Sequence, residues 1–522
     1  MPMPSSPPPL PRAPGRADRG GIAASRSGQR LRQVVLVLAV AAIGSLAGGC
    51  GRGDSGRPGL AVDVLSDAAA EELVAEATSV GLTRADAAGR IVPALARSWR
   101  VSDDGSFIVF RLAGLAGSAD RPWTAADVAR SLVRVRAAAD PGTRALLAGV
   151  AGVSAPLEDV VELRLSAPQP EILELLARPA LAIRPPRRGR DAPPPLAGAF
   201  MLAEPPAEGV RLLTADSGHF DAANVGAGRI ELRVVPPADA VRRFARGETD
   251  LVLGGFHAGV SEARVGAPRE ALVLTRARAT LHLAVNRTRA PFHQLGVRQA
   301  LERAIDRGQL GRAIYGTDAA TPILGLTPPG LSGYPGAPRP DWADLPPAAL
   351  LADARRRLAE ADLGEEGRLR VRLAIGDSIE EERIAAALVA GWSAIGAEVV
   401  VERRTARGHA RALEAGEFDV ALASTESRID SPVPFLLPLR CGANRVGLCL
   451  PEADRLLQSG WDAPTLAERM ARIALAERLW QEDVAAIPLI QPLRWALVAP
   501  RVRGFEGNPG GVHPLAALRR AG

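Results

Sequence analysis

The sequence contains no lysine, and all 64 of its strongly basic residues are arginine. This absence excludes the enzyme classes that depend on a P-loop lysine, a Schiff-base lysine or a Ser–Lys dyad. The chain also lacks a GxSxG motif, and its six histidines show none of the HxH, HxxxH or HExxH spacings that place two ligands on one metal ion. We therefore predict that the protein is not an enzyme and has no catalytic residues, no metal site and no cofactor.

Cysteine is scarce as well, and the first of the three cysteines, Cys50, directly follows the one long apolar run, residues 34–49. Six arginines and one aspartate precede this run, which is the charge pattern of an export signal. Its 16 residues fall short of the roughly 20 that a helix needs to cross a bilayer. The run and its cysteine resemble a lipobox, which implies cleavage before Cys50 and a diacylglycerol on its sulfur. An uncleaved anchor with an incidental cysteine is the alternative.

This beginning of the chain predicts where the protein works. Residues 1–49 are predicted to be a signal peptide and residues 50–59 a lipidated tether, which places the protein at the periplasmic or extracellular face of the cell envelope. Without the signal, the net charge falls from +6 to about +1, and a nearly neutral chain has no general electrostatic attraction to nucleic acid. We therefore expect contact with the membrane through the lipid and no nucleic-acid partner.

The other two cysteines, Cys441 and Cys449, remain once Cys50 is assigned to lipid. In an oxidising compartment two such cysteines are expected to pair. We predict a disulfide between them; two reduced, buried cysteines are the alternative.

The mature chain has 473 residues, enough for about three domains. Two segments, FIVFRL at residues 107–112 and VVELRL at 160–165, have the composition of strands. Between them Thr124 can cap a helix, with Asp127 at its third position. This order predicts a βαβ-like layer.

A second strand–helix–strand pattern predicts a parallel pair. The alternating strand RVRLAI at residues 370–375 precedes a helix with an apolar stripe of Ile384, Leu388 and Trp392, and strands follow at 398–401 and 418–423. Parallel strands joined in this way bind ligands beyond their carboxyl ends. Residues 424–430, which include Thr425, Arg428 and Asp430, follow the last of these strands and are the best candidate for a pocket.

Three blocks of sequence follow one another over most of the mature chain. The first is IVPALARSWRVSDDGSFIVFRL at residues 91–112 with TAADVARSL at 124–132. The second is LAVNRTRAPFHQLGVRQALERAIDRGQLGRAIYG at 283–316, and the third is PEADRLL at 451–457 followed by IPLI at 487–490. In this shared order the blocks resemble the family 5 solute-binding proteins of ABC importers, which bind oligopeptides, dipeptides or nickel, and GETDL at 247–251 adds a weaker match.

This resemblance implies an α/β type II periplasmic-binding fold, in which two hinged lobes close over a ligand, with an extra domain. Lobe I is expected to be discontinuous, over residues 60–98, 196–278 and 485–522. The extra domain is expected at 99–195 and lobe II at 279–484. The implied function is a monomeric, lipid-anchored subunit that captures a small-molecule or peptide solute and delivers it to an ABC permease.

The chain departs from its relatives at the ligand. In the peptide binders, an aspartate four residues before a proline pairs with the α-ammonium of the peptide; counting back from Pro432, this sequence has Arg428 there. Arginine favours a carboxylate or phosphate, so we expect an anionic or zwitterionic group to meet Arg428. A solvated or lobe-bridging Arg428 is the alternative, and Asp430 could replace the missing aspartate.

Phe256 and His257 follow the predicted strand 250–253 and are also candidates to line the pocket. Two other functions stay open: a ligand sensor or scaffold of the same fold that carries no cargo, and a secreted hydrolase whose acid pair assembles only in space.

Overall fold

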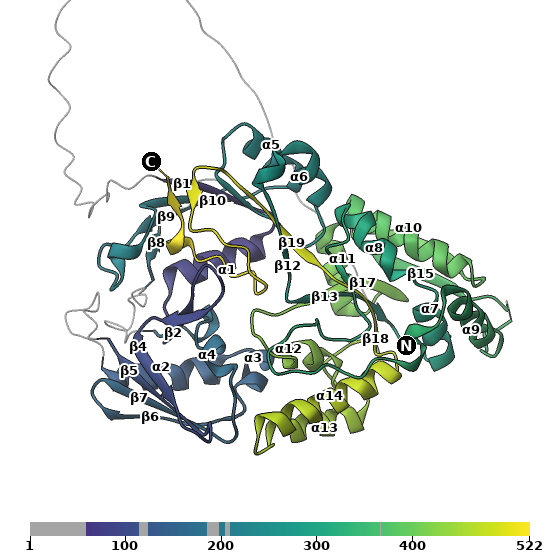
Figure 1. The fold of residues 1–522 in the computed structure, drawn as a ribbon, viewed down its shortest axis with the longest axis horizontal. Coiled ribbons are helices and arrows are strands. Elements are labelled where there is room, and N and C mark those ends of the chain that lie inside the picture. The colour runs from purple at the N-terminus through teal and green to yellow at the C-terminus, as the bar shows by residue number, and fades with distance from the viewer. Residues whose placement is uncertain (1–58, 114–123, 185–197, 204–208, 366, 522) are drawn as a thin grey trace, which may run out of the picture. The chain divides into compact units, whose positions relative to one another are not determined.

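A computed structural model of the chain describes residues 59–113, 124–184, 198–203, 209–365 and 367–521 (Figure 1). The predicted signal peptide, the lipidation at Cys50 and nearly all of the predicted tether lie outside the described residues. In the described ranges, no helix is both long and apolar enough to cross a membrane.

Seven strands form the first sheet: β1 (Leu60–Val64), β8 (Phe200–Leu202), β9 (Val210–Ala215), β10 (Arg229–Val234), β11 (Leu251–Leu253), β12 (Leu272–Arg276) and β19 (Leu493–Val498). Their order is β12-β19-β11-β1-β10-β9-β8. Strand β1 is almost wholly buried and runs parallel to both β10 and β11, as expected of an apolar run covered on both faces. Helices α1 (Asp67–Thr78), α5 (Pro237–Ala245) and α6 (Val260–Gly266) belong to this sheet's region.

Six strands form the second sheet: β13 (Ala279–Val285), β14 (Thr321–Pro322), β15 (Arg370–Ile375), β16 (Glu398–Arg403), β17 (Val420–Glu426) and β18 (Ala486–Gln491), in the order β14-β18-β13-β17-β15-β16. Its helices are α7 (Leu295–Arg303), α8 (Arg307–Tyr315), α9 (Pro347–Ala359), α10 (Ile379–Ser393) and α11 (Ala406–Ala415). Strands β15 and β16 are parallel and joined by α10, as predicted. The apolar stripe of α10, Ile384, Leu388 and Trp392, is fully buried.

Four strands form the third sheet: β4 (Ala96–Val101), β5 (Phe107–Leu112), β6 (Val150–Leu157) and β7 (Val160–Leu165), in the order β4-β5-β7-β6, with helices α2 (Ala125–Ala138), α3 (Pro141–Leu146) and α4 (Ile172–Leu175). Both predicted strands exist, and Thr124 and Asp127 form the predicted capping box of α2. The predicted βαβ-like layer is wrong, because β5 and β7 are antiparallel. The extra strand β6 forms a hairpin with β7 and reverses the chain.

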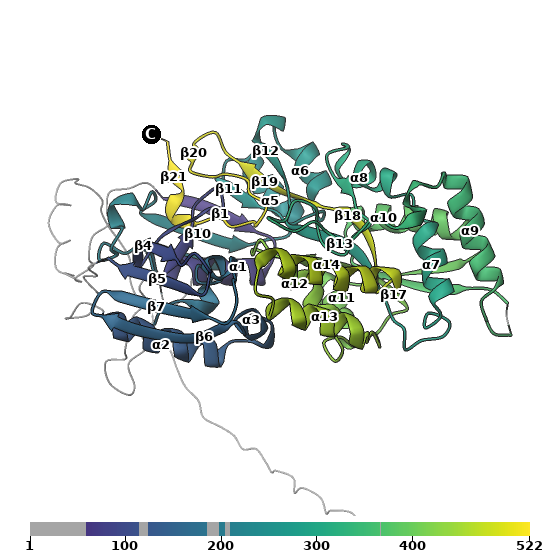
Figure 2. The same cartoon turned by 60° about the horizontal axis from the view of Figure 1, so that its bottom comes forward.

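Three further helices connect the second sheet with the third: α12 (Val433–Leu436), α13 (Pro451–Trp461) and α14 (Leu466–Glu482). Leu457 and Trp480 of these helices share one apolar core with Phe110 and Leu163 of the four-stranded sheet. Figure 2 shows α12, α13 and α14 beside α3. Two short hairpins, β2 (Thr83–Ala85) with β3 (Ile91–Pro93) and β20 (Val502–Arg503) with β21 (Arg519–Arg520), complete the fold.

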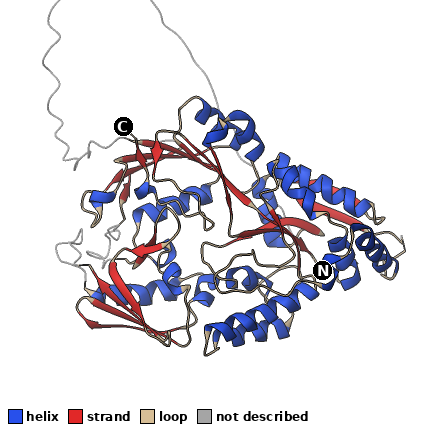
Figure 3. Ribbon diagram, in the orientation of Figure 1, coloured by secondary structure: helices blue, strands red, loops and turns tan. Residues whose placement is uncertain are grey.

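The chain crosses between the seven-stranded and six-stranded sheets from β12 to β13 and from β18 to β19 (Figures 1 and 3). These two crossings lie side by side. The Ala277 N–H donates to the Pro492 carbonyl at 3.0 Å, and Gln491 Nε2 donates to the Ala277 carbonyl at 3.0 Å. Hydrogen bonds therefore connect the two crossings.

The structure contains the predicted disulfide between Cys441 and Cys449. In the chain-entropy account, closing so short a loop stabilises the folded protein by about 2–3 kcal/mol. Replacing both cysteines with serine should lower the free energy of unfolding in urea by that amount. A reducing agent should lower the wild-type value equally and leave the double-serine variant unchanged; a wild-type midpoint that does not respond to reduction contradicts the prediction.

Candidate functional site

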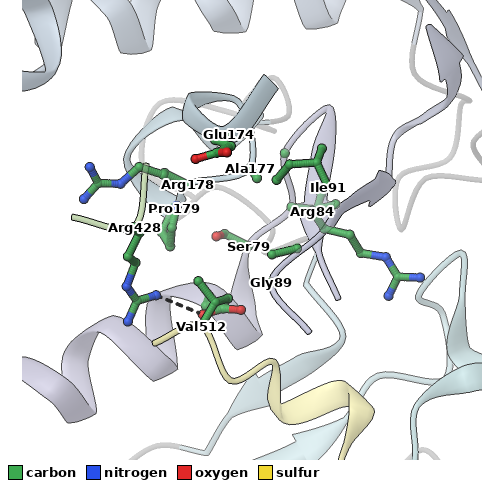
Figure 4. A pocket seen from close by; sticks show the side chains of 14 residues that line it. Ser79, Arg84, Gly89, Ile91, Glu174, Ala177, Arg178, Pro179, Arg428 and Val512 are labelled. Carbon is green, nitrogen blue, oxygen red and sulfur yellow. Dashed lines mark hydrogen bonds and ion pairs between the residues drawn. The ribbon is translucent and has the colours of Figure 1, made fainter. Parts of the chain in front are cut away.

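A small cavity of about 80 Å³ lies where three segments of the chain meet (Figure 4). Glu76 and Gly81 come from the end of α1 and the segment after it, Glu174 from α4, and Arg428 from the loop that follows β17. The site therefore combines residues from the regions of all three sheets. Arg428 lies just beyond the carboxyl end of β17 in the six-stranded sheet. Open α/β sheets bind ligands at such positions.

Arg428 is held in the structure by two acids of α1. Its Nη2 lies 3.0 Å from Glu72 Oε2 and its Nη1 lies 3.5 Å from Glu76 Oε2, the second pair being the dashed line in Figure 4. Burial raises the pKa of Glu76, although the Arg428 charge opposes this. Arg428 therefore links the loop after β17 to α1.

Arg278, in the crossing between β12 and β13, positions the loop that carries Arg428. Its Nη1 donates to the Arg428 carbonyl at 2.8 Å, and its Nη2 lies 3.6 Å from Asp430 Oδ2. The Asp430 N–H donates to Glu174 Oε2 at 2.5 Å. Burial is the largest influence on Glu174 and raises its pKa. The crossing, the loop and α4 are thus linked by one charged cluster.

Asp430, the residue predicted as a possible substitute for the missing aspartate, already has a partner. Its Oδ1 accepts the Ser332 N–H at 3.1 Å, and its Oδ2 accepts the Ser332 hydroxyl at 2.6 Å. A ligand cation at Asp430 would have to compete with Ser332 and with the guanidinium of Arg278.

Thr425 lies on β17, and one edge of this strand is open beside the cluster. Strand β15 pairs with β17 only at Val420 and Ala421, whereas β13 pairs with β17 along its whole length. The Ser427 N–H donates to the Arg278 carbonyl. Because backbone directions alternate along an antiparallel strand, the peptide groups of Ser424 and Glu426 face the opposite, open edge.

Phe256 and His257 lie outside the small cavity. The Arg494 guanidinium carbon lies 4.8 Å from the centre of the Phe256 ring, and Arg494 Nη2 is 2.7 Å from Glu426 Oε2, so Phe256 reaches the end of β17 through Arg494. His257 Nε2 lies 3.0 Å from Glu381 Oε1 at the start of α10. The structure therefore brings Arg428 and Asp430 together, connects Phe256 to them indirectly, and places His257 against another helix.

Four charged residues of the site were missed by sequence reasoning: Glu72, Glu76, Glu174 and Arg278. The sequence analysis assigns no role to the two acids of α1. Their partner Arg428 follows more than 350 residues later in the chain, with Arg428 and Glu76 separated by 352. No local pattern signals such a pairing.

Known proteins are similar to this chain over most of its length. The profile of the bacterial extracellular solute-binding proteins, family 5 (Middle), matches residues 90–446. The periplasmic murein peptide-binding protein MppA of Escherichia coli is 24% identical over 463 residues, which cover 82% of this chain and 84% of MppA. The probable deoxycholate-binding periplasmic protein YgiS of the same organism is 26% identical over 459 residues, which cover 81% of this chain and 84% of YgiS.

Solved structures match equally broadly. Haemophilus influenzae OppA, in complex with the peptide RPPGFSPFR, has a TM-score of 0.75 at 19% identity and covers 90% of this chain and 99% of OppA. The structure of Escherichia coli MppA has a TM-score of 0.76 at 22% identity and covers 89% of this chain and 99% of MppA.

Proposed function

This chain belongs to family 5 of the bacterial extracellular solute-binding proteins, and we propose that it captures a peptide-like or other small polar solute and delivers it to the permease of an ABC importer. The predicted fold class, an α/β type II periplasmic-binding fold with two hinged lobes and an extra domain, is confirmed by the solved relatives. A lipid anchor at Cys50 would hold a monomer near that permease.

The proposed lobes follow the sheets. The seven-stranded sheet is assigned to lobe I, the six-stranded sheet to lobe II and the four-stranded sheet to the extra domain. This assignment departs from the boundaries expected from the sequence at β18, which joins lobe II although it follows residue 484, and at β4, which begins before residue 99. In support, the two hydrogen-bonded crossings at Ala277 and Pro492 join the first two sheets. A few residues in such crossings can absorb the backbone rotation of lobe closure, which a ligand touching both lobes stabilises.

The observation that carries the proposal is the open edge of β17. Among the described strands, none pairs with β17 on this edge beyond Ala421, and β17 leads into the loop with Arg428, which lines the small cavity. An extended peptide can add to an exposed strand edge through main-chain hydrogen bonds, while side-chain pockets give specificity. This supports an extended, peptide-like solute.

Arg428 supports a solute without a free α-ammonium at that position. Its fixed positive charge repels an ammonium group and favours a carboxylate or phosphate. Glu72 and Glu76 pair with the guanidinium in the structure, so a ligand anion at Arg428 would compete with these two carboxylates. One relative, YgiS, is named as probably deoxycholate-binding, which is consistent with solutes other than peptides in this family.

The experiment compares each member of a short-peptide library in free and N-acetylated form, with binding measured by calorimetry. N-acetylation removes the ammonium charge, so acetylated peptides should bind at least as tightly as free ones. Arg428→Ala should weaken the best acetylated ligand by about 10- to 100-fold, because a charge-assisted hydrogen bond contributes about 1.5–3 kcal/mol. Glu76→Gln should strengthen the same ligand, since it removes a competitor for Arg428.

The control is Arg403→Ala. Arg403 is an exposed arginine of the edge strand β16, and it pairs with Glu382 of α10. It should leave every affinity unchanged. Arg428→Asp should reverse the preference, so that peptides with a free amino terminus bind more tightly than their acetylated forms. A wild-type protein that prefers free peptides, with affinities that Arg428→Ala and Arg428→Asp do not alter, contradicts the proposed role of Arg428. Failure of the whole library, with no copurifying solute found by mass spectrometry, contradicts solute capture itself.

A further inference from the structure

A second and larger cavity, of about 640 Å³, lies on the six-stranded-sheet side of the molecule. Its walls come from α7, α9, the end of α14 and the short 3₁₀ helix Asp341–Asp344. Helices α7 and α9 pack side by side in Figures 1 and 2. No residue that lines this cavity also lines the small cavity of Figure 4. Ligand pockets typically measure about 300–1,000 Å³, so its size suits a small molecule.

Glu302 lines this cavity as a buried acid with three arginines near it. The residue is 3% exposed, and the charges of these arginines act on its carboxylate, which within the described part of the chain makes no hydrogen bond or close ion pair. Burial raises the pKa of Glu302 to about 7, against the opposing charges of Arg307, Arg303 and Arg357. Near neutral pH the group can therefore both accept and donate a hydrogen bond. A buried polar group left unpaired in this way carries a desolvation cost that a ligand hydroxyl would remove.

The arginines of the cavity are already paired with acids. Arg303 Nε and Arg357 Nε lie 2.7 and 2.8 Å from the same Asp353 oxygen. Two further lining arginines have their own partners, Arg478 with Glu482 at 2.7 Å and Arg339 with Asp344 at 2.8 Å. The lining residues carry four arginines and four acids, one of them Glu302 with its raised pKa, so the lining has no large excess of either sign. A neutral ligand is favoured over an anion or a cation.

Trp342 adds an aromatic ring to this polar lining. The guanidinium carbons of Arg303 and Arg307 lie 5.3 and 5.7 Å from the ring centre and hold the ring in place. Val484, also in the lining, has a φ of 50°, a left-handed conformation that is unfavourable for a β-branched residue. Arg287 Nη2 donates to its carbonyl at 3.0 Å and stabilises the turn. Strained residues of this kind cluster at ligand-binding sites.

We propose that this cavity is a second solute site, which binds a neutral, hydroxyl-rich molecule of the sugar type. Such a ligand donates hydroxyl hydrogens to Glu302 and accepts hydrogen bonds from the guanidinium groups. Its apolar C–H face packs on Trp342, as aromatic rings pack on apolar surface. This second cavity shares no lining residue with the small cavity at Arg428. Saccharide binding can therefore be tested without knowing which solute binds at Arg428.

The probes are glucose, galactose, N-acetylglucosamine, maltose and trehalose, with binding to the purified protein followed by saturation-transfer NMR and calorimetry. At least one of them should bind with millimolar or tighter affinity. Trp342→Ala and Glu302→Leu should each weaken it by about tenfold or more, whereas Trp342→Phe should retain most of the affinity. Leu345 is 43% exposed at the cavity, so Leu345→Arg should block entry without disturbing the core and replaces any variant that fails to fold.

The matched control is Glu360→Leu, which removes an exposed acid just after α9, outside the cavity. It should not change saccharide binding. Three results overturn the proposal: no probe binds, binding is equal in wild type and Leu345→Arg, or inorganic phosphate binds in their place with the same sensitivity to Trp342→Ala.

Discussion

Replacing Arg298 with methionine is expected to lower the free energy of unfolding by about 4 kcal/mol or more, because several buried acceptors lose their donor at once. Arg298 is 2% exposed. Its Nη1 donates to the carbonyls of Phe292 and His293 at 3.0 and 2.7 Å, and its Nη2 donates to the Asp483 carbonyl and carboxylate at 2.9 and 3.0 Å. Burial lowers its pKa to about 10, so the guanidinium stays charged at neutral pH.

Urea unfolding followed by tryptophan fluorescence measures this effect. Arg355→Met is the matched control, because Arg355 also donates two hydrogen bonds to one carbonyl, that of Ala394, but on an exposed surface. It should cost about 1 kcal/mol or less. The prediction fails if the two methionine variants unfold at the same urea concentration.

The contacts of Arg298 mark the limit of sequence reasoning. The block VRQALERAIDR was recognised as a motif, but Asp483, the partner of Arg298, lies 185 residues further along the chain. Apolar periodicity and helix caps are local, and for this reason the buried stripe of α10 and the capping box of α2 could be predicted. Pairings between distant charges leave no local pattern.

The one wrong element prediction also has a local cause. Strand β6, residues 150–157, reads VAGVSAPL, and its glycine, serine, alanines and proline give it little strand propensity. Without β6, the sequence predicted a crossover from β5 to β7 and therefore a parallel pair. The hairpin of β6 with β7 makes the pair antiparallel.

Sequence reasoning located the loop of the candidate site but not its electrostatics. Residues 424–426 form the end of β17, and Arg428 in the loop that follows lines the small cavity. The two carboxylates that pair with Arg428 belong to Glu72 and Glu76 of α1, a segment far from Arg428 in the sequence. The arginine side chain alone predicts that Arg428 favours an anionic ligand group. Only the fold shows which carboxylates of the protein compete with that ligand for the guanidinium.

A second large effect is expected when Arg469 is replaced with methionine, which should destabilise the protein by about 3–5 kcal/mol. Arg469 of α14 pairs with Glu171, the residue just before α4, and their side chains are 2% and 1% exposed. Arg469 Nη1 also donates to the Pro168 carbonyl at 3.1 Å. Methionine fills similar space but leaves Glu171 as a buried charge without its counterion.

This destabilisation should depend on pH. Burial already raises the pKa of Glu171, and the Arg469 charge opposes that rise, so the variant raises the pKa further. A group with a raised folded-state pKa stabilises the fold below its unfolded pKa and loses that contribution as pH rises through the folded value. The defect of Arg469→Met should therefore be smaller at about pH 5 than at about pH 8.

The double variant Arg469→Met with Glu171→Leu separates the ion pair from the packing around it. Replacing a buried pair with apolar residues is often neutral, so the double variant should recover most of the stability lost in Arg469→Met. As a control, a double-mutant cycle can be measured on the exposed pair Arg478–Glu482, 2.7 Å apart on the same helix. Its coupling free energy should be only about 0.5 kcal/mol. A double variant as unstable as Arg469→Met would show that Glu171 is not the cause. The defect would then lie in the core that α14 shares with the four-stranded sheet.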